Sequence, residues 1–166
     1  MKKVYADNNV ICAIGKHDMR DPGEASPIAI ISAMFDAGQL PLYASNVTKE
    51  ELDPWQGDKK PVVLQLYDLL PKVPRVERQE LLGIHVYSDL YTCINSPMIE
   101  DHPLWLKLRT FGLKEFDEHH LMVAILAGCD VFLTCDKGDF GPRRSQLAKA
   151  FPLIQILWPS EALYRL

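Results

Sequence analysis

Short apolar runs alternate with longer amphipathic stretches along the chain, an order typical of α/β proteins with a parallel sheet. The runs that predict β-strands lie at residues 4–6, 41–45, 131–134 and 153–157. The stretches that predict helices lie at residues 8–15, 25–37, 48–52, 61–70, 117–127 and 143–150. The helix at 117–127 has apolar residues on nearly every side, so we expect it to be buried.

The middle of the chain gives the weakest signal. We expect mainly helix over residues 76–82 and 98–110, as a helical elaboration of the sheet at about residues 55–112. No linker rich in Gly, Ser or Pro divides the chain, and 166 residues suit one domain of ordinary size. We therefore predict a single domain over residues 1–166.

Composition excludes several classes of protein. The chain is 48% hydrophobic and 24% charged, which is typical of globular proteins and not of disordered or fibrous ones. With 18 basic and 22 acidic residues its net charge is −4, which argues against a protein that coats nucleic acid through bulk charge. The four cysteines form no C-x-x-C pair. We find no secretory leader and no apolar run that would span a bilayer, so we expect a cytoplasmic protein with no membrane partner.

Acidic residues lie where predicted strands end. Asp7 ends the first strand, Glu51 follows the second, and Asp136 follows the strand at 131–134. Asp117 begins the buried helix that leads back to that strand. Ligands of open α/β sheets bind beyond the carboxyl ends of the strands, so we expect these acids to converge. Converging carboxylates repel one another unless they shift their pKa values or bind cations, and an all-oxygen ligand set favours Mg²⁺ or Mn²⁺.

Each of these acids also has a purely structural alternative. Asp7 and Asp117 fit helix N-caps, and Glu51 with Thr48 fits a capping box. The segment 136–139 fits an ordinary turn. Spacing alone leaves these alternatives open.

Three segments of the chain combine acidic residues with a strand or a helix. The first is VYADNNVI from residue 4, and the second is SNVTKEEL from residue 45. The third and most specific runs from Asp117 to Phe140. It combines an acid, a helix with small residues, a Gly-Cys-Asp turn, a strand and the ending Thr-x-Asp-x-x-Asp-Phe. Together the three segments resemble motifs of the PIN-domain family of metal-dependent nucleases, while residues 54–112 match nothing specific in that family.

The resemblance implies a three-layer sandwich with a central, mostly parallel sheet, and a Mg²⁺- or Mn²⁺-dependent endoribonuclease that hydrolyses phosphodiester bonds. In the second motif Glu50 competes with Glu51, and we prefer Glu51 because Leu52 follows it. The acids that the resemblance assigns to metal binding and catalysis are Asp7, Glu51, Asp117 and Asp136, with Asp139 as a further metal ligand. The polar supports that it implies are Asn9 and Thr134.

Other polar residues near these motifs have less specific signals. An all-oxygen metal site needs no histidine as a base, so we expect His119 and His120 to lie on the helix surface or in packing contacts and to be dispensable for activity. Lys137, Arg143 and Arg144 fit either phosphate contacts or a solvated face. Because clustered carboxylates repel, we also expect Asp7→Asn to raise the melting temperature of the metal-free protein.

RNA is the substrate and partner that we expect. Many small bacterial members of the PIN family are toxins held by an antitoxin, so an antitoxin protein is a candidate partner, as is a second copy of the chain in a homodimer. One alternative function is a catalytically silent PIN-fold binding module in RNA processing, although all four acids are present. Another is a receiver-like phosphoacceptor domain, but its lysine after the late strand is replaced here by Thr134, Cys135 and Asp136.

Overall fold

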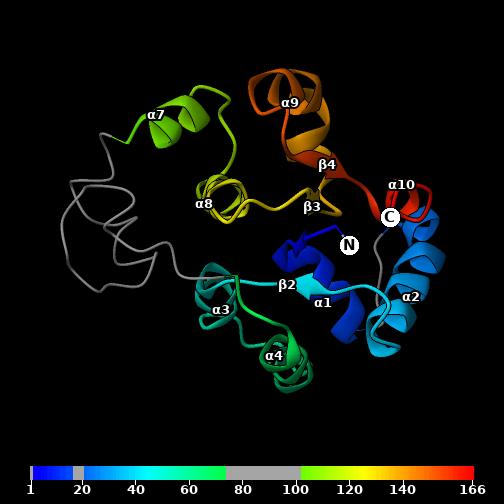
Figure 1. Ribbon diagram of the computed structural model, residues 1–166. Coiled ribbons are helices and arrows are strands. Elements are labelled where there is room, and N and C mark those ends of the chain that lie inside the picture. The colour runs from blue at the N-terminus through cyan, green and yellow to red at the C-terminus, as the bar shows by residue number, and fades with distance from the viewer. Residues whose placement is uncertain (1, 17–20, 74–101) are drawn as a thin grey trace.

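The computed structural model describes residues 2–16, 21–73 and 102–166. In these ranges the chain forms an α/β fold around one four-stranded parallel sheet with the strand order β2-β1-β3-β4 (Figure 1). The helix expected at 76–82 and Cys93 lie outside the described residues. The helix expected at 98–110 and the helical elaboration expected at about 55–112 lie partly outside them. The described cysteines are free thiols: Cys12, Cys129 and Cys135.

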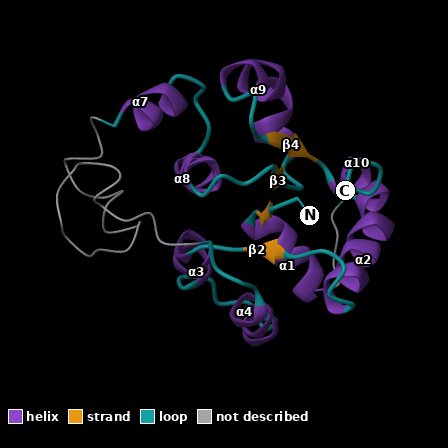
Figure 2. Cartoon of the chain, viewed as in Figure 1, coloured by secondary structure: helices purple, strands orange, loops and turns teal. Residues whose placement is uncertain are grey.

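Helices surround the short strands of the sheet (Figure 2). The strands are β1 (Val4–Ala6), β2 (Leu42–Tyr43), β3 (Val131–Leu133) and β4 (Gln155–Leu157). The helices before residue 74 are α1 (Asn8–Lys16), α2 (Pro22–Asp36), α3 (Asn46–Leu52) and α4 (Lys60–Leu69). The helices after residue 101 are α7 (Pro103–Arg109), α8 (Glu115–Leu126), α9 (Lys137–Ala150) and α10 (Pro159–Ala162).

The two central strands are buried on both faces, as the predicted sandwich requires. All residues of β1 and β3 are buried, which explains why these strands read as continuous apolar runs. Tyr5 and Phe132 belong to the core that contains α8, whereas Val4 and Val131 belong to the core that contains α1. The sheet therefore separates two helical layers, and the α/β prediction is confirmed.

The sheet topology brings the ends of β1 and β3 together. Val4 is in register with Val131, and Tyr5 with Phe132. Just past the strand, the backbone N–H of Asp7 donates to the carbonyl of Leu133 at 3.0 Å. Because parallel strands end at the same edge, the polar residues that follow these two strands meet there.

Several helix boundaries differ from the prediction for a local reason. Helix α2 begins at Pro22 because the Asp21 side chain caps it, accepting from the N–H of Gly23 at 2.9 Å. The segment 136–139 is the capped start of α9 and not a separate turn, since Asp136 is the N-cap. The N-cap of α3 is Ser45, so the expected capping box is absent from this helix.

Helix α8 is buried, as its all-round apolar pattern predicts. Four consecutive side chains, residues 121–124, have no exposed surface. The helix ends before Gly128, whose φ of +63° lies in the left-handed region that favours glycine. No helix in the described ranges has both the length and the apolar character needed to cross a membrane.

Candidate metal site

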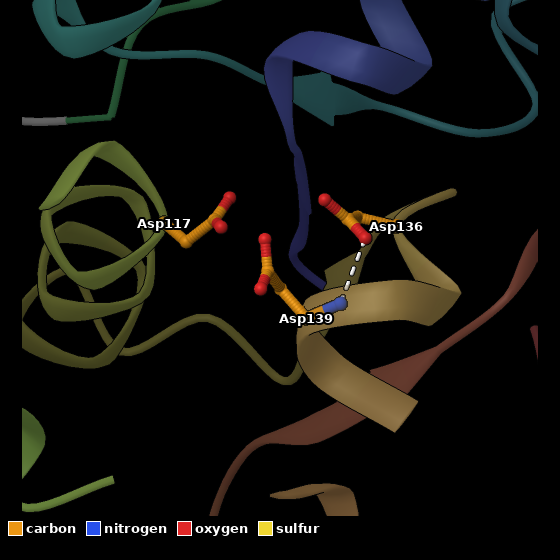
Figure 3. A group of neighbouring side chains, drawn as sticks. All are labelled: Asp117, Asp136 and Asp139. Carbon is orange, nitrogen blue, oxygen red and sulfur yellow. Dashed lines mark hydrogen bonds between the residues drawn. The ribbon is translucent and has the colours of Figure 1, made fainter. Parts of the chain in front are cut away.

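Three aspartates form a compact carboxylate group at the edge of the sheet (Figure 3). One carboxylate oxygen from each of Asp117, Asp136 and Asp139 lies within 4.8 Å of the other two. Asp117 lies in the first turn of α8, and the other two lie at the start of α9. The structure thus brings together three of the five acids that the resemblance assigns to metal binding.

The local structure explains how Asp136 and Asp139 are placed. Asp136 caps α9 by accepting, at Oδ1, from the backbone N–H of Asp139 at 2.9 Å. The N–H of Asp136 itself donates to Thr134 Oγ1 at 3.1 Å. Asp136 is therefore an N-cap and not part of the ordinary turn that was the structural alternative, and capping engages only one of its carboxylate oxygens.

Asp117 is not an N-cap, which removes its structural alternative. Helix α8 begins at Glu115, its N-cap position is Lys114, and the N-cap side chain makes no capping hydrogen bond. The Oδ2 atom of Asp117 is buried and meets no hydrogen-bond donor among the described residues. A buried carboxylate oxygen without a donor is unfavourable unless a proton or a cation binds it.

The electrostatic environment of Asp117 agrees with this geometry. Burial, followed by the negative charges of Asp7, Asp136 and Asp139, raises the pKa of Asp117 from 3.8 to about 7. The carboxyl therefore holds a proton for part of the time at neutral pH. A bound divalent cation would favour the ionised form, so cation binding here would release a proton.

A lysine lies beside the aspartates. Lys114 forms an ion pair with Asp139, and its Nζ is 4.0 Å from Asp136 Oδ2. The hydrogen bond from Lys114 is the main cause that lowers the pKa of Asp139. Because the Lys114 side chain is 73% exposed, solvent weakens this pair and a divalent ion can displace it.

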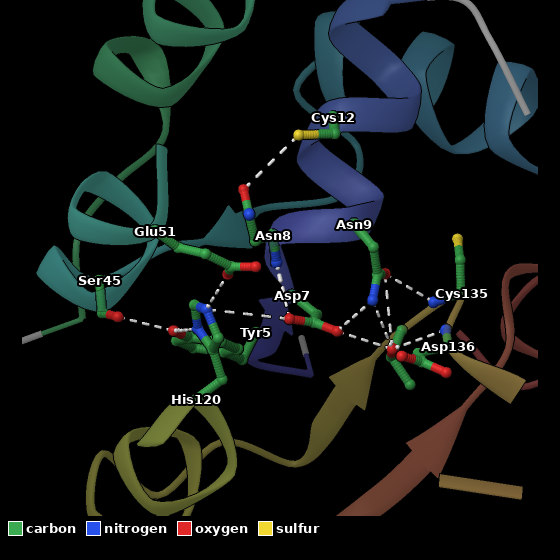
Figure 4. A network of polar contacts seen from close by, with 11 residues as sticks. Tyr5, Asp7, Asn8, Asn9, Cys12, Ser45, Glu51, His120, Cys135 and Asp136 are labelled. Atoms are coloured by element: carbon green, nitrogen blue, oxygen red, sulfur yellow. Dashed lines mark hydrogen bonds and ion pairs between the residues drawn. The ribbon is translucent and has the colours of Figure 1, made fainter. Parts of the chain in front are cut away.

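Asp7 lies in a separate, fully hydrogen-bonded setting that also involves Asn9 and Thr134 (Figure 4). Its Oδ1 accepts from the N–H of Asn8 at 2.7 Å, and its Oδ2 accepts from Thr134 Oγ1 at 2.7 Å and Asn9 Nδ2 at 2.5 Å. Burial raises the pKa of Asp7, although His120 and Thr134 oppose that rise. Asp7 is close enough to Asp117 for its charge to raise the pKa of the latter.

Asn9 and Thr134 connect the ends of β1 and β3. Thr134 Oγ1 donates to Asp7 and accepts from the N–H of Asp136, while Asn9 Oδ1 accepts from the N–H of Cys135 at 2.7 Å. These two residues therefore hold Asp7 and the start of α9 in a fixed relation.

Glu51 contacts a histidine and lies outside the group of three aspartates. His120 Nε2 lies 3.1 Å from Glu51 Oε2 and 4.0 Å from Asp7 Oδ1. Burial tends to raise the pKa of Glu51, but the hydrogen bond and charge of His120 bring the net pKa below its ordinary value. The neighbouring Glu50 faces a different environment, since its charge acts on Tyr67 of α4.

The contacts of His120 differ from what the sequence pattern suggests. Both histidines of α8 are buried, so the expected surface location is wrong and the packing alternative is correct. His119 stacks on Trp105 with ring centroids 4.8 Å apart, whereas His120 faces Glu51. The spacing of His120, three residues after Asp117, puts both on one face of the helix but does not identify Glu51 as a partner.

The basic residues that follow the site are engaged within the chain. Each of the three makes an ion pair or a charged hydrogen bond, so none is a free phosphate-binding group in this state. The contacts are Lys137 with Glu24 at 2.7 Å, Arg143 with the Asp139 carbonyl at 2.8 Å, and Arg144 with Glu161 at 2.6 Å.

No protein-family model matches the chain, and a search of curated proteins also finds no match. The fold and the site therefore define its class in structural terms. It is an α/β protein with a four-stranded parallel sheet and a cluster of three aspartate carboxylates that suits a metal ion.

Proposed function

We propose that the chain is a metal-dependent endoribonuclease of the PIN type, which uses Mg²⁺ or Mn²⁺ to hydrolyse phosphodiester bonds in RNA. The observation that carries this proposal is the group of three aspartates, in which a buried oxygen of Asp117 has no donor. Its oxygen-only composition suits hard divalent cations. Its place beyond the ends of β1 and β3 is where open α/β sheets bind ligands.

The roles of the residues follow from their positions. Asp117, Asp136 and Asp139 would hold the cation. A bound divalent cation supplies an acidified water and neutralises charge that develops on the phosphate. Asp7, fixed by its hydrogen bonds, and Glu51, held by His120, are the acids that would extend the ligand set towards the substrate.

The choice of RNA rests on the resemblance of the motifs to PIN nucleases. Lys114 supports a phosphate-bearing substrate, because a cation that displaces it from Asp139 would free an exposed ammonium group beside the site. The same resemblance leads us to propose a cytoplasmic location, and an antitoxin protein or a second copy of the chain as a protein partner.

A catalytically silent binding module is the second candidate. It is favoured by the ion pair of Lys114 with Asp139, which already supplies one positive charge to the acidic cluster without a metal. The two candidates differ in what a divalent ion does. A nuclease binds Mn²⁺ and then cleaves RNA, whereas a silent module binds RNA equally well in excess EDTA.

Mn²⁺ calorimetry and an RNA cleavage assay on the wild type and Asp117→Asn test the proposal. Glu115→Gln is the matched control, since it removes an exposed carboxylate from the same helix turn. We expect Mn²⁺-dependent cleavage in the wild type and in the control, and a loss of binding and cleavage of about 100-fold or more in Asp117→Asn. Cleavage that persists in EDTA, or an Asp117→Asn protein as active as the wild type, would overturn the proposal.

A further inference from the structure

A buried chain of polar side chains leads from the sheet to Glu51 (Figure 4). Ser45 Oγ lies 2.6 Å from the hydroxyl of Tyr5, and this hydroxyl lies 2.7 Å from His120 Nδ1. On the opposite side of the ring, His120 Nε2 lies 3.1 Å from Glu51 Oε2. The imidazole of His120 has no exposed surface.

The hydrogen-bonding capacities of these groups place a hydrogen on the side of His120 that faces Glu51. An ionised glutamate only accepts hydrogen bonds, so His120 Nε2 carries the hydrogen that lies towards Glu51. Nδ1 then either accepts the hydroxyl hydrogen of Tyr5 or, in the imidazolium form, donates to the Tyr5 oxygen. Ser45 Oγ completes the chain at the Tyr5 hydroxyl. Both forms place a hydrogen on Nε2 towards Glu51, and burial keeps the phenol protonated by raising the pKa of Tyr5.

We propose that His120 is a positioning residue for the metal site, which holds Glu51 Oε2 through Nε2–H and so orients the Glu51 carboxylate. Tyr5 and Ser45 would act through His120 by fixing the plane of its ring. This inference rests on the proposed function, because Glu51 has to be held in place only if it serves the site. It also replaces the expectation that both histidines are dispensable.

The neighbouring histidine provides an internal comparison. His119 is equally buried and belongs to the same helix, but its ring packs on Trp105 and Phe116. A change at His119 therefore perturbs the packing of α8 without touching Glu51. If His120 had only a packing role, leucine at either position would have similar consequences.

A double-mutant cycle between His120 and Glu51 distinguishes positioning from packing. Binding of Mn²⁺ alone is measured by calorimetry for the wild type, His120→Leu, Glu51→Gln and the double variant. We expect His120→Leu to weaken Mn²⁺ binding by about 10-fold or more, as is typical of residues that orient metal ligands. We expect this effect to vanish in the Glu51→Gln background, because His120 acts through Glu51.

Two further variants complete the test. His120→Gln keeps an N–H donor and should recover part of the lost affinity, whereas His119→Leu should bind Mn²⁺ within about 3-fold of the wild type. If His120→Leu does not fold, Tyr5→Phe replaces it in the cycle. That change removes the hydroxyl but keeps the ring that stacks on Phe132 at 5.7 Å.

The results separate this inference from the proposed function. Equal weakening of Mn²⁺ binding in both Glu51 backgrounds, or no weakening at all, overturns the positioning role. ¹⁵N NMR of the metal-free protein gives a second readout, and a hydrogen on Nδ1 of His120 in place of Nε2 also overturns that role. A wild-type protein that binds no Mn²⁺ defeats the proposed function, and this result does not depend on the tautomer.

Discussion

Asp117→Asn should stabilise the metal-free protein at neutral and alkaline pH. The wild-type carboxyl has an ordinary pKa of 3.8, and the fold raises it to about 7. A rise of about three pKa units corresponds to at most about 4 kcal/mol of destabilisation once the group is ionised. Because the site is partly open to solvent, screening reduces this value, and we expect a gain of about 2 kcal/mol in Asp117→Asn at pH 8.

The pH dependence gives the sign of this effect. The pKa of Asp117 is higher in the folded state than in the unfolded state, so protonation of its carboxyl favours the folded state. This stabilising contribution of the protonated carboxyl is fully present below about pH 4. That contribution is lost as the pH rises towards about 7. The asparagine variant cannot ionise, so its advantage over the wild type should be less than half of its full value at pH 5 and close to its full value at pH 8.

Urea unfolding in EDTA at pH 5 and pH 8 measures both quantities. Glu115→Gln is the control for losing a negative charge near the N-terminus of α8, which by itself costs about 0.3–1 kcal/mol. Two outcomes would refute the reasoning. One is an Asp117→Asn protein that is no more stable than the wild type at pH 8, and the other is an advantage of the same size at both pH values.

Three further predictions concern neighbouring residues. Asp7→Asn should lower the free energy of unfolding by about 1–3 kcal/mol, because the new amide N–H₂ would point at one of the groups that now donate a hydrogen bond to Asp7. A variant that is more stable than the wild type in urea unfolding would contradict this prediction. Lys114→Met should tighten Mn²⁺ binding a few-fold in calorimetry, because the ammonium group that competes with Mn²⁺ for Asp139 is removed. Unchanged or weaker Mn²⁺ binding would contradict this competition. Glu24→Ala should destabilise the fold by about 1–3 kcal/mol, because the N–H and the hydroxyl of Ser160 each donate to the Glu24 carboxylate at 2.8 Å and would lose this acceptor. The affinity for Mn²⁺ should not change in this variant.

The hydrogen bonds of Asp7 reverse the expectation drawn from the sequence. Clustered negative charge suggested that neutralising Asp7 would stabilise the metal-free protein. The structure shows that the Asp7 carboxylate accepts three hydrogen bonds, whereas Asp117 Oδ2 has no donor. The stabilising substitution is therefore expected at Asp117, because charge repulsion dominates only where hydrogen bonds do not offset it.

The strands and the grouping of the late acids could be predicted because their signals are local. Buried parallel strands give continuous apolar runs, as in β1 and β3. The spacing of Asp136 and Asp139 places both on the first turn of α9, and Asp117 opens the helix that precedes β3. The prediction of a turn at 136–139 was wrong because an aspartate with a following polar residue caps a helix as readily as it forms a turn.

The contacts of His120 could not be predicted from local pattern. Its partners Tyr5 and Glu51 are separated from it by 115 and 69 residues. Only the packing of α3 against α8, and the core that Tyr5 shares with α8, bring them together. A buried histidine and a surface histidine also look alike in a helix whose apolar residues lie on every side. The polar chain from Ser45 to Glu51 depends on the tertiary structure alone.

Anomalous diffraction from crystals soaked in Mn²⁺ tests the central claim most directly. We predict an anomalous peak within bonding distance of carboxylate oxygens from Asp117, Asp136 and Asp139, with the Lys114 ammonium displaced from Asp139. A well-ordered site with Lys114 still paired to Asp139 and no Mn²⁺ between the three aspartates would contradict the assignment of a metal site.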